Sequence, residues 1–262
     1  DIRFVARKFS QANAGIIFWG MGISQHTHGT DNSRCLISLA LLTGNIGKKG
    51  SGLHPLRGQN NVQGASDAGL IPMFLPDYQP VSDPEFRSKY EAIWQSPLPK
   101  EQGLTVVEIT NAAFNGNIKA MYIMGENPAM SDPDQNHVRA ALEKLDCLVV
   151  QDIFPTETAA FADVILPASA FPEKTGTVTN TDRRVQLGRQ AVPPPGNAKQ
   201  DYWIIQEIAK RMGLEWNYQH PKDIFSEMRI VMSSLNGITW ERLESEGAVT
   251  YPSLSETDPG QP

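Results

Sequence analysis

A stretch spanning residues 44–69 carries the side chains best suited to binding a charged, polar ligand. It is rich in glycine, and a run of amide side chains from Gln59 to Gln63 follows a single arginine, Arg57. Glycine lets a backbone approach a ligand closely or take a positive φ. Amides offer donors and acceptors together, which suits a ligand with ring nitrogens and several phosphates. The stretch shows no apolar periodicity, so we expect neither a helix nor a strand across it.

The residues before this stretch predict the start of an α/β unit. Residues 15–19 (GIIFW) indicate a buried strand, and a short amphipathic helix near residues 3–12 precedes it. The glycine turn that follows is a weak dinucleotide fingerprint, because Gln25 stands where a third glycine is needed. Asp31 is expected to cap a helix that runs through Leu42. The nearly all-round apolar surface of this helix predicts burial between layers.

Farther along, helices alternate with strands. Helices are expected at residues 84–94, 105–115, 134–145, 201–212 and 223–233, and strands at 119–124, 147–150 and 163–167. Alternation of this kind predicts an α/β fold with a mainly parallel sheet and Rossmann-like layers. Such sheets bind ligands beyond the carboxyl ends of their strands. The polar turns there predict a nucleotide crevice; they are residues 21–25, 125–131, 151–158 and 168–177.

Composition excludes several classes of function. A net charge of -6 over 262 residues argues against nucleic acid or an anionic membrane surface as the main partner. The longest apolar run, residues 35–42, is too short to cross a bilayer, so we expect no membrane insertion. Two cysteines without a CxxC spacing predict no disulfide framework and favour a reducing, cytoplasmic location. Because the sequence starts at Asp1 without a signal-peptide pattern, we expect a processed chain or a piece of a longer polypeptide.

Six segments of the sequence carry a recognisable pattern. They are WGMGISQHTHGTDN (19–32), LRGQNNVQG (56–64), MGENPAMSD (124–132), VQDIFPTETAAFADVILP (150–167), TGTVTNTDRRVQ (175–186) and DYW (201–203). In this order they resemble the catalytic subunit of molybdenum- or tungsten-dependent formate dehydrogenases, most closely the soluble NAD-linked type. The resemblance covers about the first 215 residues and implies the middle-domain fold of the formate dehydrogenase and DMSO reductase group.

In that family, this part of the chain helps to hold two molybdopterin guanine dinucleotides around one molybdenum or tungsten atom. The resemblance implies that Met21 and Gln25 lie at one cofactor. It also places six residues around the pterin or guanine nucleotide ends: Gln59, Asn127, Ser131, Gln151, Asp152 and Asp201. The chemistry agrees, since a carboxylate can accept from the edge of guanine or from a ribose hydroxyl. A serine and free N–H groups at a helix start suit a phosphate.

Arg57 resembles the arginine of the family's active site. A guanidinium fork can hold both oxygens of formate while the C–H bond points elsewhere. The resemblance implies oxidation of formate to CO2 at the metal, with electrons leaving through an iron–sulfur cluster. The expected partners are formate and the other segments and subunits of a formate dehydrogenase complex.

The family's cluster-binding cysteines and its metal-ligating cysteine or selenocysteine are absent from this sequence. Cys35 and Cys147 fall in an apolar helix and a strand, so we interpret both as small buried apolar residues. His26 and His28 lack a third ligand, and we assign no metal ligand within the chain. The cluster and the metal ligand are therefore expected outside it. On its own, the 262-residue chain should carry no cofactor and should not oxidise formate.

Combining pattern and resemblance divides the chain into four parts. They are an α/β segment with the cofactor and active-site loop (1–70), a proline-rich excursion (71–100), a Rossmann-like nucleotide-binding half (101–215) and a C-terminal tail (216–262). Alternative functions remain open: another bis-molybdopterin oxidoreductase such as a nitrate reductase, a non-catalytic nucleotide-binding module, or a plain NAD-binding dehydrogenase. The third is the weakest, because of Gln25 and because no acidic residue is suitably placed after the turn.

Overall fold

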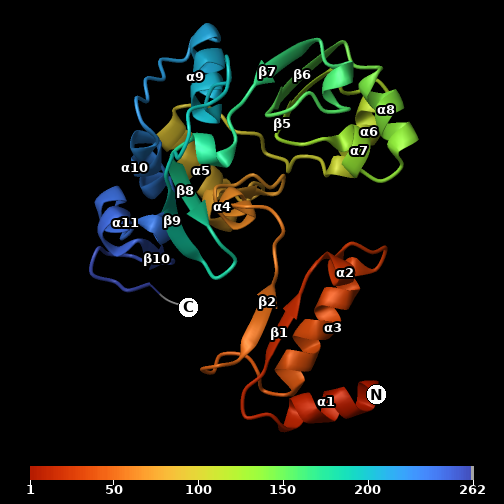
Figure 1. The fold of residues 1–262 in the computed structure, drawn as a ribbon, viewed down its shortest axis with the longest axis vertical. Coiled ribbons are helices and arrows are strands. Elements are labelled where there is room, and N and C mark those ends of the chain that lie inside the picture. Colours follow the sequence, from red (N-terminus) through yellow and green to blue (C-terminus); the bar gives the residue numbers. More distant parts are fainter. Residues whose placement is uncertain (261–262) are drawn as a thin grey trace.

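The computed structural model describes residues 1–260, and its first 56 residues form a separate unit (Figure 1). Strands β1 and β2 of this N-terminal unit pair in parallel, with Ile16 opposite Gly52. Figure 1 shows the unit below the remainder of the chain and connected to it through the segment that follows β2. Its elements are α1 (Ile2–Gln11), β1 (Ile16–Trp19), α2 (Met21–Ser24), α3 (Gly29–Leu42) and β2 (Gly52–Pro55).

Helix α3 ends at Leu42 as predicted, but it begins at Gly29, so Asp31 lies in its first turn and does not cap it. The prediction that this helix is buried between layers was also wrong. Among the described residues of the N-terminal unit, Ala40 is the only buried apolar side chain, while Leu41 and Leu42 are largely exposed. Strand β1 forms as predicted, but Ile16 and Phe18 are exposed, so the prediction that this strand is buried was wrong as well. Cys35 on the same helix is exposed too, which corrects its assignment as a buried residue. The all-round apolar surface of a helix predicts that it needs cover on all sides. The described residues of this chain cover only one side of α3.

A second unit contains a parallel sheet with the strand order β5-β6-β7. Ile123, Leu148 and Val150 turn one face of this sheet toward a helical layer, where they form a buried cluster. Its elements are α6 (Val106–Phe114), β5 (Ala120–Met124), α7 (Pro128–Ser131), α8 (Gln135–Leu142), β6 (Cys147–Asp152), η2 (Ala159–Phe161) and β7 (Val164–Pro167). The parallel sheets and their flanking helices confirm the predicted α/β class. Cys147, at the start of β6, is exposed rather than buried, because the sheet's buried interior begins only at Leu148.

Local sequence explains where α6 starts. Thr105 accepts a hydrogen bond from the backbone N–H of Glu108, and the Glu108 carboxylate accepts one from the N–H of Thr105 at 2.7 Å. This reciprocal capping box satisfies two N–H groups that a helix start otherwise leaves unpaired. The Glu108 carboxylate accepts hydrogen bonds from both the backbone N–H and the hydroxyl of Thr105. Because these two bonds stabilise its anionic form, they lower the pKa of Glu108.

A third unit is built around an antiparallel sheet with the strand order β10-β9-β8, which the sequence did not predict. After the strand at 163–167, the next element predicted from the sequence was the helix at 201–212, so β8 and β9 were missed. The elements of this unit are β3 (Phe74–Leu75), η1 (Pro76–Tyr78), β4 (Gln79–Pro80), α5 (Pro84–Trp94), η3 (Phe171–Glu173), β8 (Gly176–Thr179), β9 (Arg184–Gly188), α9 (Asp201–Arg211), α10 (Pro221–Val231), η4 (Ser233–Leu235), α11 (Trp240–Glu246) and β10 (Ala248–Thr250).

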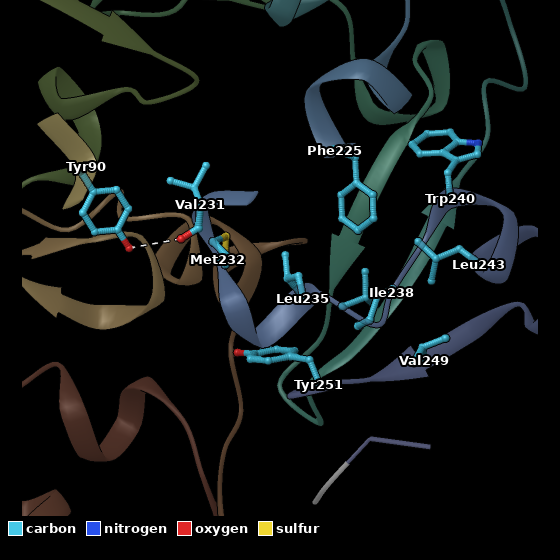
Figure 2. Packing of buried hydrophobic residues seen from close by; sticks show 11 residues of the cluster. Tyr90, Phe225, Val231, Met232, Leu235, Ile238, Trp240, Leu243, Val249 and Tyr251 are labelled. Carbon is cyan, nitrogen blue, oxygen red and sulfur yellow. Dashed lines mark hydrogen bonds between the residues drawn. The ribbon is translucent and has the colours of Figure 1, made fainter. Parts of the chain in front are cut away.

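The core of this third unit joins segments that lie far apart in the sequence. Tyr90 of α5 packs in one buried cluster with Val185 of β9 and with apolar side chains that follow residue 220 (Figure 2). Residues 216–260 therefore fold into a core rather than trailing along the surface. The four-part division of the chain remains a prediction, because packing within one chain does not by itself define domain boundaries.

The stretch 44–69 contains two regular elements, so the prediction that it holds neither helix nor strand was wrong. Strand β2 forms by pairing with β1, which a local pattern cannot reveal. Helix α4 (Val62–Asp67) has Asn61 as its N-cap residue, whose backbone is left-handed with a φ of 62°. This short helix sets the position of the segment that contains Arg57.

Candidate functional site

Arg57 lies between β2 and α4, and its side chain is exposed. Within residues 1–260 its guanidinium makes one hydrogen bond, a long one of 3.5 Å from Nη1 to the hydroxyl Oγ of Ser66. A guanidinium has five N–H donors in a planar fork. Most of the donors of Arg57 therefore face solvent and are available to an anion.

The guanidinium of Arg57 borders a polar cleft of about 630 Å³, a volume that includes space open to solvent. The cleft lies where the segment before and within α4 meets the β8–β9 hairpin. Gln59, predicted to lie at a pterin or guanine nucleotide end, lines the cleft beside Arg57. The lining residues are Arg57, Gln59, Asn60, Asn61, Val62, Gln63, Val178, Thr179, Asn180, Thr181 and Gln186. Amides and hydroxyls thus surround one cation, and no carboxylate shares the lining.

Asn61, at the start of α4, joins the α4 side of the cleft to β8. Its side-chain Oδ1 accepts a hydrogen bond of 2.9 Å from the backbone N–H of Thr179. Gly64 packs against the same amide, since a Cβ at position 64 would stand only 2.2 Å from Oδ1 of Asn61. A larger residue at 64 would therefore push Asn61 off Thr179 and change the shape of the cleft.

A second polar group forms at the carboxyl end of the β5-β6-β7 sheet, as predicted for a crevice. Gln151, at 0% exposure, accepts a hydrogen bond from the hydroxyl of Tyr122 and donates one of 2.8 Å to Oδ1 of Asp201. The other carboxylate oxygen of Asp201 pairs with the ammonium of Lys174. Burial, and then the charge of Asp201, raises the pKa of Tyr122 and keeps its hydroxyl protonated as a donor. Two of the predicted residues, Gln151 and Asp201, are thus in direct contact.

The turn that follows β5 is tied to the turn that follows β6. Oδ1 of Asn127 accepts hydrogen bonds from the N–H and the hydroxyl of Thr158, at 3.1 and 2.8 Å. Nδ2 of Asn127 donates to Glu157 at 2.7 Å, and this hydrogen bond is the main reason that the pKa of Glu157 is lowered. Ser131, at the end of α7, is exposed and donates to the backbone carbonyl of Asn127 at 3.1 Å. Asn127 therefore holds the two turns together, and the Ser131 hydroxyl lies next to them at the end of α7.

Asp152 ends β6 and is partly exposed. Its Oδ1 accepts a hydrogen bond of 2.6 Å from the backbone N–H of Ile153. Its backbone carbonyl accepts one of 2.9 Å from Ala168, the residue after β7. The second carboxylate oxygen of Asp152 has no hydrogen bond among the described residues and can accept one from a ligand.

Met21 and Gln25 lie apart from both polar groups. They belong to α2 and its C-terminal cap on the N-terminal unit, and both are exposed. Figure 1 shows α2 at one end of the N-terminal unit, separate from α4. The structure thus arranges the predicted residues in three places: the Arg57 cleft, the carboxyl end of the β5-β6-β7 sheet, and the N-terminal unit.

Sequence reasoning missed several residues that shape these sites. Lys174 could have been found, because it is the cation of a turn already predicted to border the crevice. Tyr122 lies on a predicted strand, but its contact with Gln151 depends on strand register. Thr179 belongs to a strand that was not predicted. No sequence pattern indicated Tyr251, because its hydroxyl contacts the side chain of Gln63, which is 188 residues away in the sequence.

The residues of the crevice and the cleft fit the polar part of a pterin nucleotide. Besides the donors and acceptors already described, Ser169 follows β7 at 1% exposure, and its hydroxyl Oγ has no hydrogen-bond partner within the described chain. A buried hydroxyl without a partner is uncommon and is expected to gain one when a polar ligand binds. The described residues include no group of three or more His, Cys, Asp or Glu side chains placed to hold a metal ion. The donor set therefore suits the organic part of such a cofactor rather than its metal.

None of the helices within residues 1–260 is both long and apolar enough to cross a membrane.

Comparison with known proteins identifies relatives over almost the whole chain. A family model described as molybdopterin oxidoreductase matches residues 3–211. The F420-dependent formate dehydrogenase subunit alpha of Methanocaldococcus jannaschii is 49% identical over 97% of this chain and 38% of its own length. Formate dehydrogenase H of Escherichia coli is 42% identical over 100% of this chain and 37% of its own length. A probable oxidoreductase of Bacillus subtilis, YjgC, is 48% identical over 95% of this chain and 25% of its own length.

These figures mean that the chain spans roughly a quarter to two fifths of the length of these curated relatives. Among solved structures, acetylene hydratase from Pelobacter acetylenicus superposes with a TM-score of 0.66 at 20% identity. The superposition covers 97% of this chain and 37% of that one. At this identity the similarity supports the fold alone.

Proposed function

The chain belongs to the molybdopterin oxidoreductase family, and we propose that it forms part of the catalytic subunit of a formate dehydrogenase. The observation that carries this proposal is the exposed guanidinium of Arg57 at an amide-lined cleft, with only one long hydrogen bond of its own. An arginine whose donors are free, in a cleft without a competing carboxylate, is suited to bind a small carboxylate.

Arg57 would bind formate through two parallel N–H···O hydrogen bonds, one to each carboxylate oxygen. This arrangement fixes the plane of formate and leaves the C–H bond pointing away from the guanidinium. Oxidation then breaks that bond, so that formate yields CO2, one proton and two electrons. When bound, the molybdopterin centre supplies the acceptor for the two electrons. The amides from Gln59 to Gln63 border the same cleft and would limit the water around the bound anion.

The cofactor is proposed to be a pair of molybdopterin guanine dinucleotides carrying molybdenum or tungsten, with an iron–sulfur cluster bound outside this chain. Gln151 and Asp201 would contact one nucleotide end. Two of the four lone-pair sites of the Asp201 carboxylate face Gln151 and Lys174, and two remain for a guanine edge. Asp152, with one free carboxylate oxygen, would accept from a ribose or guanine group.

The other proposed contacts serve the phosphate and pterin parts of the cofactors. Ser131 offers a hydroxyl at the rim of the crevice, where a phosphate would find it. Asn127 and Gln59 would act through the shape of the crevice and of the cleft. Met21 and Gln25, on the N-terminal unit, would contact the second cofactor.

The proposed partners are formate and the remaining segments and subunits of a formate dehydrogenase complex. A cytoplasmic location belongs to the same proposal. It is supported by Cys35 and Cys147, which are both free thiols exposed to solvent and would stay reduced in that compartment.

The proposal is tested on the purified holoenzyme that contains this chain. Formate-dependent reduction of an artificial dye, together with analysis of metal and guanine nucleotide, should show turnover and a stoichiometric pterin cofactor. Nitrate-dependent oxidation of the reduced dye, without turnover of formate, would instead assign the chain to a nitrate reductase. A protein without pterin would leave only a nucleotide-binding module.

A further inference from the structure

Four polar side chains from three distant segments meet behind the Arg57 cleft. Nε2 of Gln63 lies 2.7 Å from Oδ1 of Asp67, 3.2 Å from the hydroxyl of Tyr78 and 3.1 Å from the hydroxyl of Tyr251. Burial, and after it the nearby Asp67 carboxylate, raises the pKa of both tyrosine hydroxyls. The Gln63 amide thus joins the Asp67 carboxylate to both tyrosines. We call Gln63, Asp67, Tyr78 and Tyr251 the Asp67 network.

Asp67 is the buried centre of this network. It is 4% exposed, and no Lys, Arg or His within residues 1–260 forms a salt bridge with it. Burying a carboxylate is costly unless hydrogen bonds replace its water. Here the Gln63 amide donates to the carboxylate at 2.7 Å, and a hydrogen bond to a charged group is stronger than one between neutral groups. The same amide also contacts both tyrosine hydroxyls. The end of α4 is thereby fixed to both tyrosines.

The two tyrosines come from parts of the chain that sequence reasoning placed outside the site. Tyr78 belongs to η1 in the proline-rich excursion, and Tyr251 follows β10. Figure 2 shows the Tyr251 ring at the edge of the buried cluster, with its hydroxyl directed away from Val249. The network thus links the segment that contains Arg57 to the core of the third unit.

Backbone strain at Tyr78 indicates that its position is imposed. Asp77 and Tyr78 both have positive φ, 59° and 56°, a conformation that side chains other than glycine seldom adopt. The Asp77 carboxylate accepts a hydrogen bond of 3.2 Å from the backbone N–H of Ser234, which holds the turn from the other side. Strained residues of this kind persist where the surrounding structure fixes them and are common near functional sites.

The network reaches Arg57 by two routes. Ser66, which accepts the long hydrogen bond from Arg57, directly precedes Asp67 on α4. Gln63 lines the same cleft as Arg57. In addition, burial and the Asp67 carboxylate raise the pKa of Tyr78, whereas the charge of Arg57 opposes them. The Tyr78 hydroxyl therefore lies within electrostatic reach of both charges.

We propose that Asp67 is a positioning residue, which through Tyr78 and Tyr251 holds the segment from Arg57 to Asp67 so that the guanidinium faces the cleft. This inference rests on the proposed function, because the anion that Arg57 would bind is formate. It assigns a role in substrate affinity to a buried aspartate and two tyrosines, which would act through the position of Arg57 and not by binding formate themselves.

The first experiment measures the position of the segment without any substrate. Amide hydrogen exchange over residues 57–67, and the rate of tryptic cleavage after Arg57, are compared in the wild type, Tyr78→Phe, Tyr251→Phe and Asp67→Asn. Loss of one such hydrogen bond should speed local opening about 5-fold. Tyr218→Phe is the matched control, because its hydroxyl bonds to a different carboxylate, that of Glu227. The control should leave exchange over residues 57–67 unchanged.

The second experiment measures steady-state kinetics of the holoenzyme with formate. Tyr251→Phe should raise KM for formate about 5-fold, with little change in kcat and with wild-type metal and guanine nucleotide content. If the network acts through Arg57, the same substitution made in an Arg57→Lys background should have almost no further effect. Asp67→Glu, which keeps the charge, should restore part of the affinity that Asp67→Asn loses.

The outcomes separate this inference from the proposed function. Faster exchange over residues 57–67 together with non-additive KM effects would support it. Unchanged exchange in all three variants, or KM effects that simply add to that of Arg57→Lys, would overturn it even in an active formate dehydrogenase. If the wild-type holoenzyme oxidises no formate, the proposed function fails, and the exchange rates alone then support or overturn the positioning role.

Discussion

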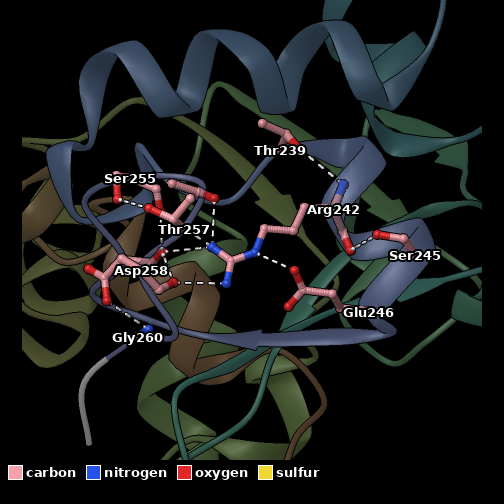
Figure 3. Close-up of polar contacts among 10 residues, drawn as sticks. Thr239, Arg242, Ser245, Glu246, Ser255, Thr257, Asp258 and Gly260 are labelled. Carbon is pink, nitrogen blue, oxygen red and sulfur yellow. Dashed lines mark hydrogen bonds and ion pairs between the residues drawn. The ribbon is translucent and has the colours of Figure 1, made fainter.

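Arg57 and Arg242 are the same chemical group in two opposite environments. The Arg242 side chain is 9% exposed, and its guanidinium donates to the carbonyls of Gly237 and Asp258 at 2.9 and 2.8 Å (Figure 3). It also donates to the Ser253 hydroxyl and forms a salt bridge with Glu246 at 2.8 Å. Arg57, by contrast, is exposed and makes one hydrogen bond of 3.5 Å. One guanidinium is saturated by the fold, and the other is free.

The difference shows how the role of an arginine can be inferred from its partners. Acceptors from the fold surround Arg242, so its donors join α11 to the segment that follows β10, and no ligand can reach them. The donors of Arg57 face water at a cleft, where an anion with two oxygens can replace the water. We therefore expect Arg242 to control stability and Arg57 to control substrate turnover, with little overlap.

The largest effect is expected for Arg57→Lys in the holoenzyme. The charge remains but the planar fork is lost, so transition-state stabilisation should fall by about 2–5 kcal/mol. That range corresponds to a loss in kcat/KM for formate of roughly 30-fold to several thousand-fold. Formate-dependent dye reduction measures it, with Arg34→Lys on α3 as the control. Thermal stability should be unchanged, and wild-type kinetics would remove Arg57 from the mechanism.

The reverse pattern is expected for Arg242→Ala. Several buried acceptors lose their donor, so the free energy of unfolding should fall by about 2–4 kcal/mol. Urea denaturation measures this loss. In the fraction that stays folded, KM for formate should match that of the wild type. A stable Arg242→Ala protein with a raised KM would mean that the two arginines are not separable in the way proposed.

Alkaline pH probes the buried cluster of the third unit, which contains Tyr90, without changing either arginine. Burial, and then the charge of Asp77, raises the pKa of Tyr90 to about 12. Unfolded tyrosine ionises near pH 10, so the unfolded state loses its proton first as the pH rises. The contribution of Tyr90 is therefore complete below pH 10 and is lost between about pH 10 and 12, at most about 3 kcal/mol. Urea midpoints across this range should fall less steeply in Tyr90→Phe; equal slopes would contradict the assignment.

Asp201 is expected to show an intermediate behaviour, because its carboxylate is partly satisfied by Lys174 and Gln151. Asp201→Ala and Asp152→Ala should each lower the guanine nucleotide bound to purified holoenzyme, corresponding to about a 10-fold loss of affinity or roughly 1.4 kcal/mol. Nucleotide and metal analysis measures this. Asp134→Ala serves as the control, because Asp134 only caps α8. If both variants kept full cofactor and lost only stability, Asp152 and Asp201 would be structural residues.

Much of the fold was predictable because local patterns determine it. The helices at 84–94 and 105–115 and the strands at 119–124, 147–150 and 163–167 follow from periodicity and from glycine and proline stops. The resemblance to formate dehydrogenase catalytic subunits is confirmed by relatives at 42–49% identity. The β8-β9-β10 sheet was missed, because its pairing depends on residues that are distant in the sequence. The burial of α3 and Cys35 was wrongly predicted, since burial depends on which surfaces face each other.

The candidate site was predictable in its residue types but not in its arrangement. The sequence brought Arg57 and its amides together, because they are neighbours in the chain. Only the structure shows that Gln151 contacts Asp201 while Met21 and Gln25 lie on another unit. The link between Gln63 and Tyr251 depends entirely on tertiary packing. The roles of all nine predicted site residues remain proposals until the variants are measured.

The most direct test of the central claim is chemical rescue of Arg57→Ala by guanidinium. If a free guanidinium fork binds formate, millimolar guanidinium added to the variant holoenzyme should restore formate-dependent dye reduction along a saturable curve. Methylammonium, which carries a charge but no fork, should restore much less. The rescue is read at metal and guanine nucleotide contents equal to those of the wild type. Absence of rescue at full cofactor content, or wild-type turnover by Arg57→Ala without any additive, would contradict the assignment of Arg57 as the group that binds formate.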